Sequence, residues 1–141
     1  KEFENGTFRE VIDDTSAEPE IVEKVVFISG RLYYDLAKYK TEKGISNVAL
    51  VRLEQIHPIP RKQIDEIIEK YKKSSQLIWA QDEPENMGAW PFINRKLHDL
   101  DFKLISRDEN ASPAAGLMEQ YRQTEQKIME AVFKENVAVP S

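Results

Sequence analysis

The sequence predicts an α/β domain in which helices cover both faces of a mostly parallel sheet. Four short apolar runs rich in β-branched residues recur along the chain, and each is followed by a stretch whose apolar residues return every three or four positions. Such runs are typical of strands buried on both faces, and such stretches are typical of amphipathic helices. Since parallel neighbours need crossover connections, four strand-then-helix units indicate one covered sheet.

Length and composition indicate one ordinary globular domain. The 141 residues include 40% hydrophobic and 32% charged residues, which excludes a fibrous repeat and a disordered chain. The net charge is −5 and the basic residues form no stripe, so we expect no nucleic-acid partner. No apolar run approaches the roughly 20 residues that span a bilayer, so we expect no membrane partner. The absence of cysteine excludes a disulfide framework and a thiolate metal site.

The N-terminal segment is predicted to lead into the domain. Residues 7–12 alternate as in a short edge strand, and residues 13–20 have the polar and proline content of a linker. The first residues lack the apolar core of a signal peptide and resemble the middle of a longer polypeptide. We therefore expect an edge strand and linker from a preceding domain over residues 1–23, and the domain itself over residues 24–141.

The first two strand-then-helix units have clear boundaries. Residues 25–29 predict a buried strand, and a helix over residues 31–43 follows it, ended by Gly44 where a left-handed C-cap belongs. Residues 48–53 repeat the strand pattern. After two prolines, a second helix is predicted from its inner stripe of Ile64, Ile67, Ile68 and Tyr71.

The last two units are separated by a polar loop. Residues 77–81 predict the third strand, the loop DEPENMG follows, and residues 89–98 predict a helix. Residues 102–106 predict the fourth strand, and Ser112-Pro113 resembles an N-cap with proline at the first helical position. A long helix should follow, with a buried face formed by Leu117, Met118, Tyr121, Ile128, Met129, Val132 and Phe133.

Known catalytic and cofactor-binding signatures are absent from the sequence. The two histidines, His57 and His98, lack metal-ligand spacing, and the patterns HExxH, GxSxG, GxGxxG and GxxxxGK[ST] do not occur. We therefore predict no catalytic, cofactor-binding or metal-binding residue in this chain. We interpret His57 as a loop residue packed beside prolines, with an acid–base role as the alternative.

Three arginines are predicted at the carboxyl edge of the sheet. Arg31 follows the first buried strand, Arg52 ends the second, and Arg107 follows the last. Ligands bind at this edge in open α/β sheets, so these guanidinium groups are candidates for binding phosphate or carboxylate anions. The alternative is ion pairing with nearby acids, which the sequence supplies as Glu54, Asp82, Glu83 and Asp108.

The segment DEPENMGAW combines acids, a proline-bounded turn and a tryptophan. Paired carboxylates at Asp82 and Glu83 are candidates for acid–base chemistry. Because adjacent strand residues point to opposite faces, we expect no facing dyad and interpret the segment as a structural loop anchored by Trp90. Its candidate contact residues toward other domains are Glu83, Asn86 and Trp90.

Four stretches together resemble one known family. SGRLYYDL, VALVRLEQIHPIP, WAQDEPENMGAW and NASPAAG occur in the order and spacing of the C-terminal, transketolase-like domain of the decarboxylating component of 2-oxoglutarate dehydrogenase. The similarity runs from Gly6 to Phe133. One stretch departs from the family's Gly-Arg-Pro-x-Ser-Ala-x-Pro-Ala-x-Gly: SRDENASPAAG keeps only Arg107, Ala111, Pro113, Ala114 and Gly116.

The resemblance implies a three-layer α/β/α fold with a five-stranded mixed sheet, whose first short strand, over residues 8–12, runs antiparallel. It also implies an oxidoreductase acting on 2-oxo acids in the citric acid cycle, a homodimer that binds thiamine diphosphate and magnesium. That enzyme decarboxylates 2-oxoglutarate and succinylates the lipoyl group of dihydrolipoyl succinyltransferase. It would lie in the bacterial cytoplasm, or in the mitochondrial matrix of a eukaryote.

The family's Gly-Asp-Gly…Asn cofactor motif has no match in this chain. We therefore expect a non-catalytic domain that supports the dimer and the interdomain structure of the enzyme. One alternative is an effector-binding module, in which Arg31, Arg52 and Arg107 take the anion of a nucleotide or an acyl-CoA. The other is a self-sufficient α/β enzyme that uses Asp82, Glu83 or His57.

Overall fold

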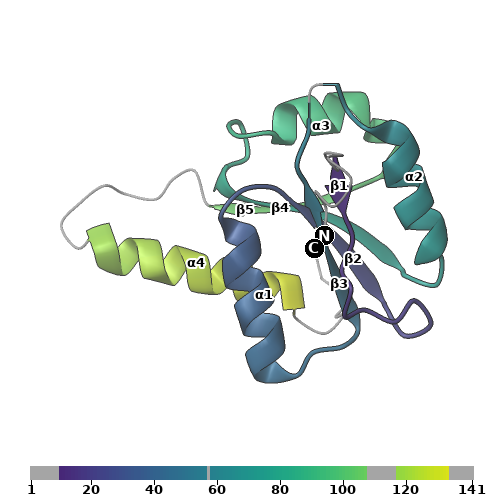
Figure 1. Ribbon diagram of the computed structural model, residues 1–141. Helices are drawn as coiled ribbons and strands as arrows, with labels where there is room; N and C mark the ends of the chain where they lie inside the picture. Colours follow the sequence, from purple (N-terminus) through teal and green to yellow (C-terminus); the bar gives the residue numbers. More distant parts are fainter. Residues whose placement is uncertain (1–9, 57, 108–116, 134–141) are drawn as a thin grey trace, which may run out of the picture.

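The chain forms three layers, with a five-stranded sheet between two pairs of helices (Figure 1). The computed structural model describes residues 10–56, 58–107 and 117–133, with backbone alone at residues 107 and 117–124. The elements in chain order are β1 (Val11–Ile12), β2 (Lys24–Ile28), α1 (Leu32–Lys43), β3 (Val48–Leu53), α2 (Arg61–Lys70), β4 (Gln76–Pro84), α3 (Trp90–Lys96), the 3₁₀ turn η1 (His98–Leu100), β5 (Lys103–Arg107) and α4 (Leu117–Phe133).

The sheet is mixed, in the order β1-β3-β2-β4-β5. Four strands are parallel, and β1 alone runs antiparallel, with Val11 opposite Leu53 and Ile12 opposite Arg52. This confirms the three-layer α/β prediction. Since β3 and β4 flank β2 on opposite sides, the strand order reverses between β2 and β4, and that reversal positions the site described below.

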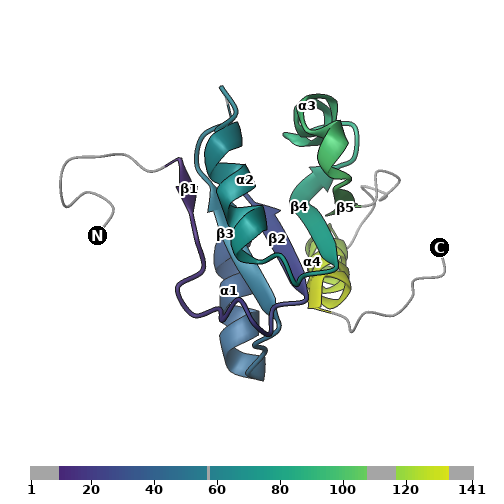
Figure 2. The same cartoon turned by 90° about the vertical axis from the view of Figure 1, so that its right-hand side faces the viewer.

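Each face of the sheet has its own core, because the strands bury both sets of alternating side chains. Phe27 and Trp79 lie on the face of the sheet that α2 and α3 cover, and they pack in the core beneath these helices. Ile28 and Ile78, the residues next to them in sequence, pack against the face covered by α1 and α4. Figures 1 and 2 show these helix pairs on opposite sides of the sheet.

Two predicted boundaries were wrong. The third predicted strand continues to Pro84, so three residues assigned to the loop belong to β4, where Pro84 pairs with Arg107 after a register shift. The helix predicted over residues 89–98 ends at Lys96 and passes into η1, and Asp101 then takes a positive φ of 58°. The N-cap predicted at Ser112-Pro113 and the first residues of the predicted edge strand lie outside the described residues.

Helix α4 is present and packs on the sheet at its C-terminal end, whereas the side chains of Leu117, Met118 and Tyr121 of its predicted buried face lie outside the described part. Ile128 and Val132 are buried, and Met129 and Phe133 pack at the margin of the same core. The buried Nζ of Lys24 donates a hydrogen bond to the carbonyl of Val132 at 3.0 Å. A cation at this end of a helix also interacts favourably with the helix dipole. Among the described residues, no helix is apolar and long enough to span a membrane.

The segment predicted as a linker is fixed to the sheet by Asp14. Its Oδ2 accepts the backbone N–H of Leu50 at 2.9 Å and lies 3.6 Å from Nζ of Lys40. The ammonium group of Lys40 also donates to Oγ of Ser16 at 3.1 Å. The bond to Leu50 satisfies an N–H on the outer edge of β3, beyond the two residues that pair with β1.

Asp13 extends this attachment to α2. Its Oδ1 accepts the phenol O–H of the fully buried Tyr71 at 2.7 Å, and its Oδ2 forms an ion pair with Lys70. The carboxylates of Asp13 and Asp14 therefore each pair with a lysine and accept a hydrogen bond from one further donor. We call Asp13, Asp14, Lys40, Lys70 and Tyr71 the strap clamp.

Candidate functional site

A pocket of about 310 Å³ lies at the carboxyl ends of β2 and β4. It is lined by residues 29–32 after β2, by Trp79 and residues 81–83 of β4, and by Ala89. The strand order reverses between these two strands, and ligands bind at such a position in open α/β sheets. We call it the switch-point pocket.

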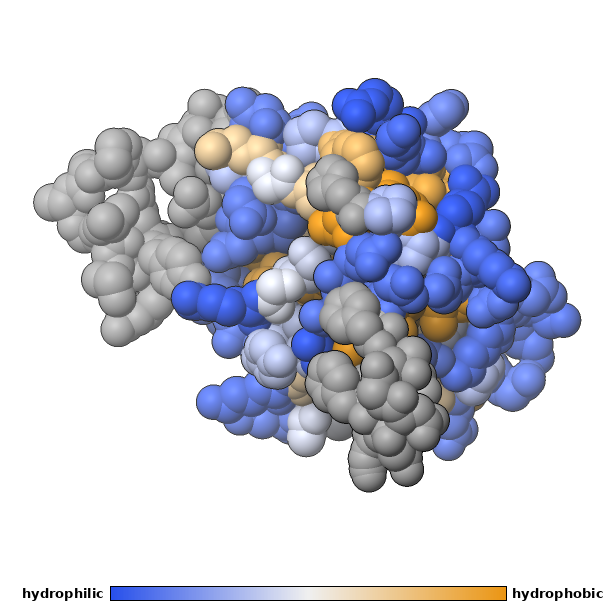
Figure 3. Space-filling model, turned by 45° about the horizontal axis from the view of Figure 1, so that its top comes forward, coloured by the Kyte–Doolittle hydropathy of each residue, from blue (hydrophilic) through white to orange (hydrophobic). Residues whose placement is uncertain are grey.

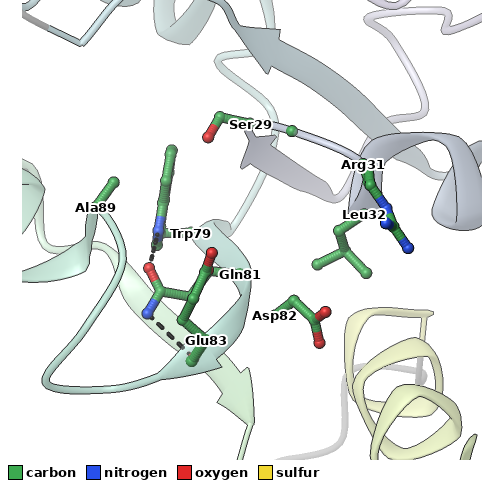
Figure 4. A pocket seen from close by; sticks show the side chains of 9 residues that line it. Ser29, Arg31, Leu32, Trp79, Gln81, Asp82, Glu83 and Ala89 are labelled. Atoms are coloured by element: carbon green, nitrogen blue, oxygen red, sulfur yellow. Dashed lines mark hydrogen bonds between the residues drawn. The ribbon is translucent and has the colours of Figure 1, made fainter. Parts of the chain in front are cut away.

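The two sides of the pocket differ in character (Figure 4). Arg31, Leu32 and Asp82 lie on the side toward α4, whereas Trp79 and Ala89 lie on the side toward α3. The turn after β2 reaches α1 through Gly30, whose φ of 81° suits a residue without a side chain. Of the charged residues that line the pocket, Arg31 and Asp82 therefore lie toward α4, and Glu83 lies beside Gln81.

Gln81 organises the other side. Its side chain is buried, and its Oε1 accepts hydrogen bonds from Nε1 of Trp79 at 2.9 Å and from the backbone N–H of Trp90 at 3.0 Å. Its Nε2 donates to three carbonyls of the following loop, those of Glu83, Pro84 and Met87. One amide thus joins the end of β4, the loop and the start of α3.

Gly88 completes this loop for a steric reason. Its φ is 67°, and a Cβ placed on it would lie 2.9 Å from Oε1 of Glu83. The left-handed backbone therefore favours glycine at this position. The hydrogen bonds of Gln81 hold the loop at the end of β4.

Acidic residues lie close together beside the pocket. Glu125 of α4 is hydrogen-bonded to Asp35 of α1, and the charge of Asp82 on β4 also acts on Glu125. The hydrogen bond to Asp35, burial and the neighbouring negative charges raise the pKa of Glu125 to about 7, against a lowering effect of Arg31. Arg31 therefore acts electrostatically on Glu125, while its predicted ion pairing with Asp82 or Glu83 stays a prediction.

The second candidate arginine, Arg52, does not line the pocket. Arg52 forms a 2.7 Å ion pair with Glu54, as its ion-pairing alternative predicts. Its guanidinium lies 5.0 Å from the ring centre of Tyr33 and 5.4 Å from that of Tyr34. The side chain of Arg107 lies outside the described part of the structure.

Asp82 and Glu83 both line the switch-point pocket. In Figure 4, Asp82 lies toward Arg31 and Leu32, whereas Glu83 lies beside Gln81, at the irregular end of β4. The expectation that they form no facing dyad stays a prediction. His57 lies outside the described residues. Within the described residues, no three acidic or histidine side chains are grouped so as to hold a metal ion.

The predicted interface residues differ in exposure. Glu83 and Asn86 are exposed, but the indole of Trp90 is only 9% exposed and packs in the core between the sheet and α3. Trp90 therefore anchors the loop from within and offers little surface. On the face in Figure 3, hydrophobic residues show only in small areas among hydrophilic ones.

Sequence reasoning missed three residues that matter here. Met87 is 56% exposed at the tip of the loop, and its only signal is an apolar residue within a polar stretch. Asp35 follows Arg31 by one helical turn, which is a recognisable spacing. Glu125 carries no local signal, because its partners come from α1 and β4.

Comparisons with known proteins agree with this fold. The family model for the 2-oxoglutarate dehydrogenase C-terminal region matches residues 1–133. The chain is 39% identical over 139 residues to a 2-oxoglutarate dehydrogenase E1 component of Rickettsia prowazekii (strain Madrid E), covering 92% of this chain and 15% of that protein. It is 35% identical over 133 residues to a 2-oxoglutarate dehydrogenase E1/E2 component of Corynebacterium glutamicum, covering 90% and 11%.

A solved structure supports the fold alone. A split-gene transketolase, described as an inactive beta4 tetramer, superimposes with a TM-score of 0.54 at 16% identity, covering 78% of this chain and 38% of that one. The relatives above are much longer than this chain, which spans 11 to 15% of their length. Because the family model covers nearly the whole sequence, the chain belongs to the 2-oxoglutarate dehydrogenase C-terminal family.

Proposed function

We propose that this chain is the non-catalytic C-terminal lobe of an E1 component that oxidatively decarboxylates 2-oxoglutarate. The observation that carries the proposal is the combination of a match over residues 1–133 with coverage of only 15% of the Rickettsia relative. In this proposal the reacting groups belong to the rest of the enzyme. The lobe completes the dimer and shapes surfaces between domains.

Thiamine diphosphate and magnesium would be bound elsewhere in the full-length enzyme. The switch-point pocket does not fit a diphosphate, because Asp35, Asp82, Glu83 and Glu125 surround or adjoin its one cation, Arg31. A diphosphate placed there would be repelled by those carboxylates. We therefore derive no catalytic step from this pocket.

The enzyme would act as a homodimer in the citric acid cycle and pass a succinyl group to the lipoyl group of dihydrolipoyl succinyltransferase. Residues 1–23 would enter from a preceding domain. Glu83 and Asn86 would contact a neighbouring domain, with Met87 in place of the buried Trp90. The bacterial sources of the relatives support a bacterial cytoplasmic location.

Turnover measurements test this proposal. The purified 141-residue chain should release no carbon dioxide from 2-oxoglutarate when thiamine diphosphate and magnesium are supplied. The full-length protein should do so, and deletion of this chain from it should lower activity and dimer content together. Turnover by the 141-residue chain alone would overturn the proposal.

An effector site is the second candidate function, favoured by the position of the switch-point pocket at the carboxyl edge of the sheet. Arg31 would have to bind the anion of a nucleotide or an acyl-CoA there against the repulsion of the same carboxylates, and Arg52 and Arg107 are the other candidates. Titration with AMP and with acetyl-CoA, followed by amide NMR shifts, tests this idea. Absence of a shift at all three arginines, up to saturating ligand, would remove it.

A further inference from the structure

A second hollow, of about 640 Å³, runs along β5 between α3 and α4. We call it the edge groove, and its apolar lining includes Leu104, Ile105 and Ile128. Leu104 packs toward the core under α3, whereas Ile105 packs toward the core under α4. The groove therefore crosses the edge of the sheet, where β5 is the end strand.

Two lysines give this groove a basic margin. Lys103 of β5 and Lys127 of α4 both line it, and both are exposed. Within the part of the chain that the structure describes, neither ammonium group forms an ion pair. The edge groove thus combines apolar walls with two lysines, and Glu85 of the same chain lies at one end of it.

The loop of residues 83–88, which we call the acidic loop, has the opposite character. Glu83 and Glu85 are exposed and form no ion pair among the described residues. Met87, which follows them in the loop, is also exposed. Gln81 and Gly88 fix the loop, so little conformational freedom is lost when it binds.

The acidic loop adjoins the edge groove without filling it. Glu85 lines the groove at the end nearest the loop. The hydrogen bonds of Gln81 hold the loop at the end of β4, so the loop cannot fold into the groove of its own chain. A second copy, however, presents the same loop and the same groove.

We propose that two copies of this chain dock reciprocally, with the acidic loop of each in the edge groove of the other. Met87 contacts the apolar wall, and Glu83 and Glu85 face Lys103 and Lys127 of the second copy. A twofold axis beside Glu85 generates both contacts at once, as a self-complementary interface requires. The inference names the surface of the proposed homodimer and in that respect rests on the proposed function.

Charge reversal with rescue tests this interface in the full 141-residue chain. Sedimentation equilibrium should find a reversible dimer. Glu83→Lys with Glu85→Lys, or Lys103→Glu with Lys127→Glu, should each weaken self-association by roughly tenfold or more, because like charges then face each other. The variant with all four reversals should dimerise again, since every opposed pair is inverted together. Met87→Ser should weaken the dimer without changing any charge.

A matched control uses two exposed glutamates of α2. Glu66→Lys with Glu69→Lys changes the net charge as much as the loop reversal does, and should leave the dimer unchanged. Circular dichroism checks that each variant is folded. The inference would be overturned if the wild-type chain is a monomer or if the loop reversals do not weaken the dimer. It would also be overturned if the variant with all four charge reversals stays monomeric. The proposed function would survive such a result if the full-length enzyme still turned over 2-oxoglutarate.

Discussion

The strap clamp and the switch-point pocket both gather carboxylates at the sheet, but in opposite electrostatic surroundings. In the clamp, Asp14 meets Lys40 and a backbone N–H, and Asp13 meets Lys70 and a phenol. Beside the pocket, Glu125 is hydrogen-bonded to Asp35 and lies near Asp82, and these contacts and burial raise its pKa to about 7. The acids of the clamp each meet a lysine, whereas Glu125 meets other acids.

The difference indicates which region serves the fold. Buried charges are costly unless each has a partner and its remaining hydrogen bonds are made. The clamp meets that condition: Asp13 and Asp14 precede β2, Lys40 lies on α1, and Lys70 and Tyr71 lie at the end of α2. The acids at the pocket are partly or fully exposed to solvent, which lowers the cost of placing them near one another.

Asp14→Ala should have the largest effect on stability. It leaves Nζ of Lys40 without its carboxylate where that side chain is only 9% exposed, and it removes the acceptor of the Leu50 N–H. We expect a loss of about 4 kcal/mol in the free energy of unfolding, as for other broken buried ion pairs. Urea unfolding measures it.

The double variant Asp14→Ala with Lys40→Met serves as the control for Asp14→Ala. It removes the stranded ammonium and should recover part of the loss. A loss below about 1 kcal/mol for Asp14→Ala would place the pair among ordinary surface ion pairs and would remove the contrast with the pocket.

Gln81→Met should have the next largest effect on the free energy of unfolding. The reason is that Gln81, although it lines the pocket, also stabilises the fold. The change leaves the Trp79 indole N–H and the Trp90 backbone N–H without their acceptor. We expect about 2 kcal/mol of destabilisation, since buried unsatisfied donors cost this much. Thermal unfolding and the fluorescence of the two tryptophans measure it.

Exposed Gln126 offers a matched control for Gln81. Gln126→Met removes one hydrogen bond to Glu130 on the surface of α4 and should be nearly neutral. Equal losses for the two variants would contradict the account of Gln81 as the organiser of the loop.

The fold was predictable because its signals are local. Alternation and helical spacing act over a few residues, so β2, β3, α1 and the C-cap at Gly44 were found from the sequence. The ion pair of Arg52 and Glu54 was offered because charged residues near a strand end usually pair with neighbouring acids.

The clamp and the acids of the pocket lacked such local signals. Asp13 meets Tyr71 across 58 positions, and the polar segment that holds Asp13 has the composition of a linker. Glu125 meets Asp35 only because α1 and α4 cover the same face of the sheet. Contacts of this kind depend on how helices pack, which a periodic pattern does not specify.

Tyr71→Phe sharpens the comparison with a smaller change in the clamp. It removes one hydrogen bond to Asp13 and keeps the buried ring. Burial and this bond to a carboxylate raise the pKa of Tyr71, so the phenol stays a donor through the neutral range. We expect a loss of about 1.5 kcal/mol by urea unfolding.

Tyr39→Phe is the control for Tyr71→Phe, because Tyr39 packs by ring stacking on Phe133 and has no hydrogen bond from its phenol in the described structure. It should change stability little. An equal loss at both positions would contradict a specific role for the Asp13 bond.

Glu125→Gln should have the smallest effect, and it appears only as a function of pH. The pKa of Glu125 in the folded chain is about 7, above its ordinary value of 4.5, so the folded state binds this proton more tightly than the unfolded state does. The resulting stabilisation is complete below pH 4.5 and is lost as the pH rises through about 7. Wild type should therefore lose some stability between pH 4.5 and about 7, and Glu125→Gln should lose less.

Urea unfolding midpoints measured across this pH interval test the difference between wild type and Glu125→Gln, and Glu66→Gln on α2 is the control. Equal slopes for wild type and Glu125→Gln would show that Arg31 already balances these acids, and the contrast with the strap clamp would fail.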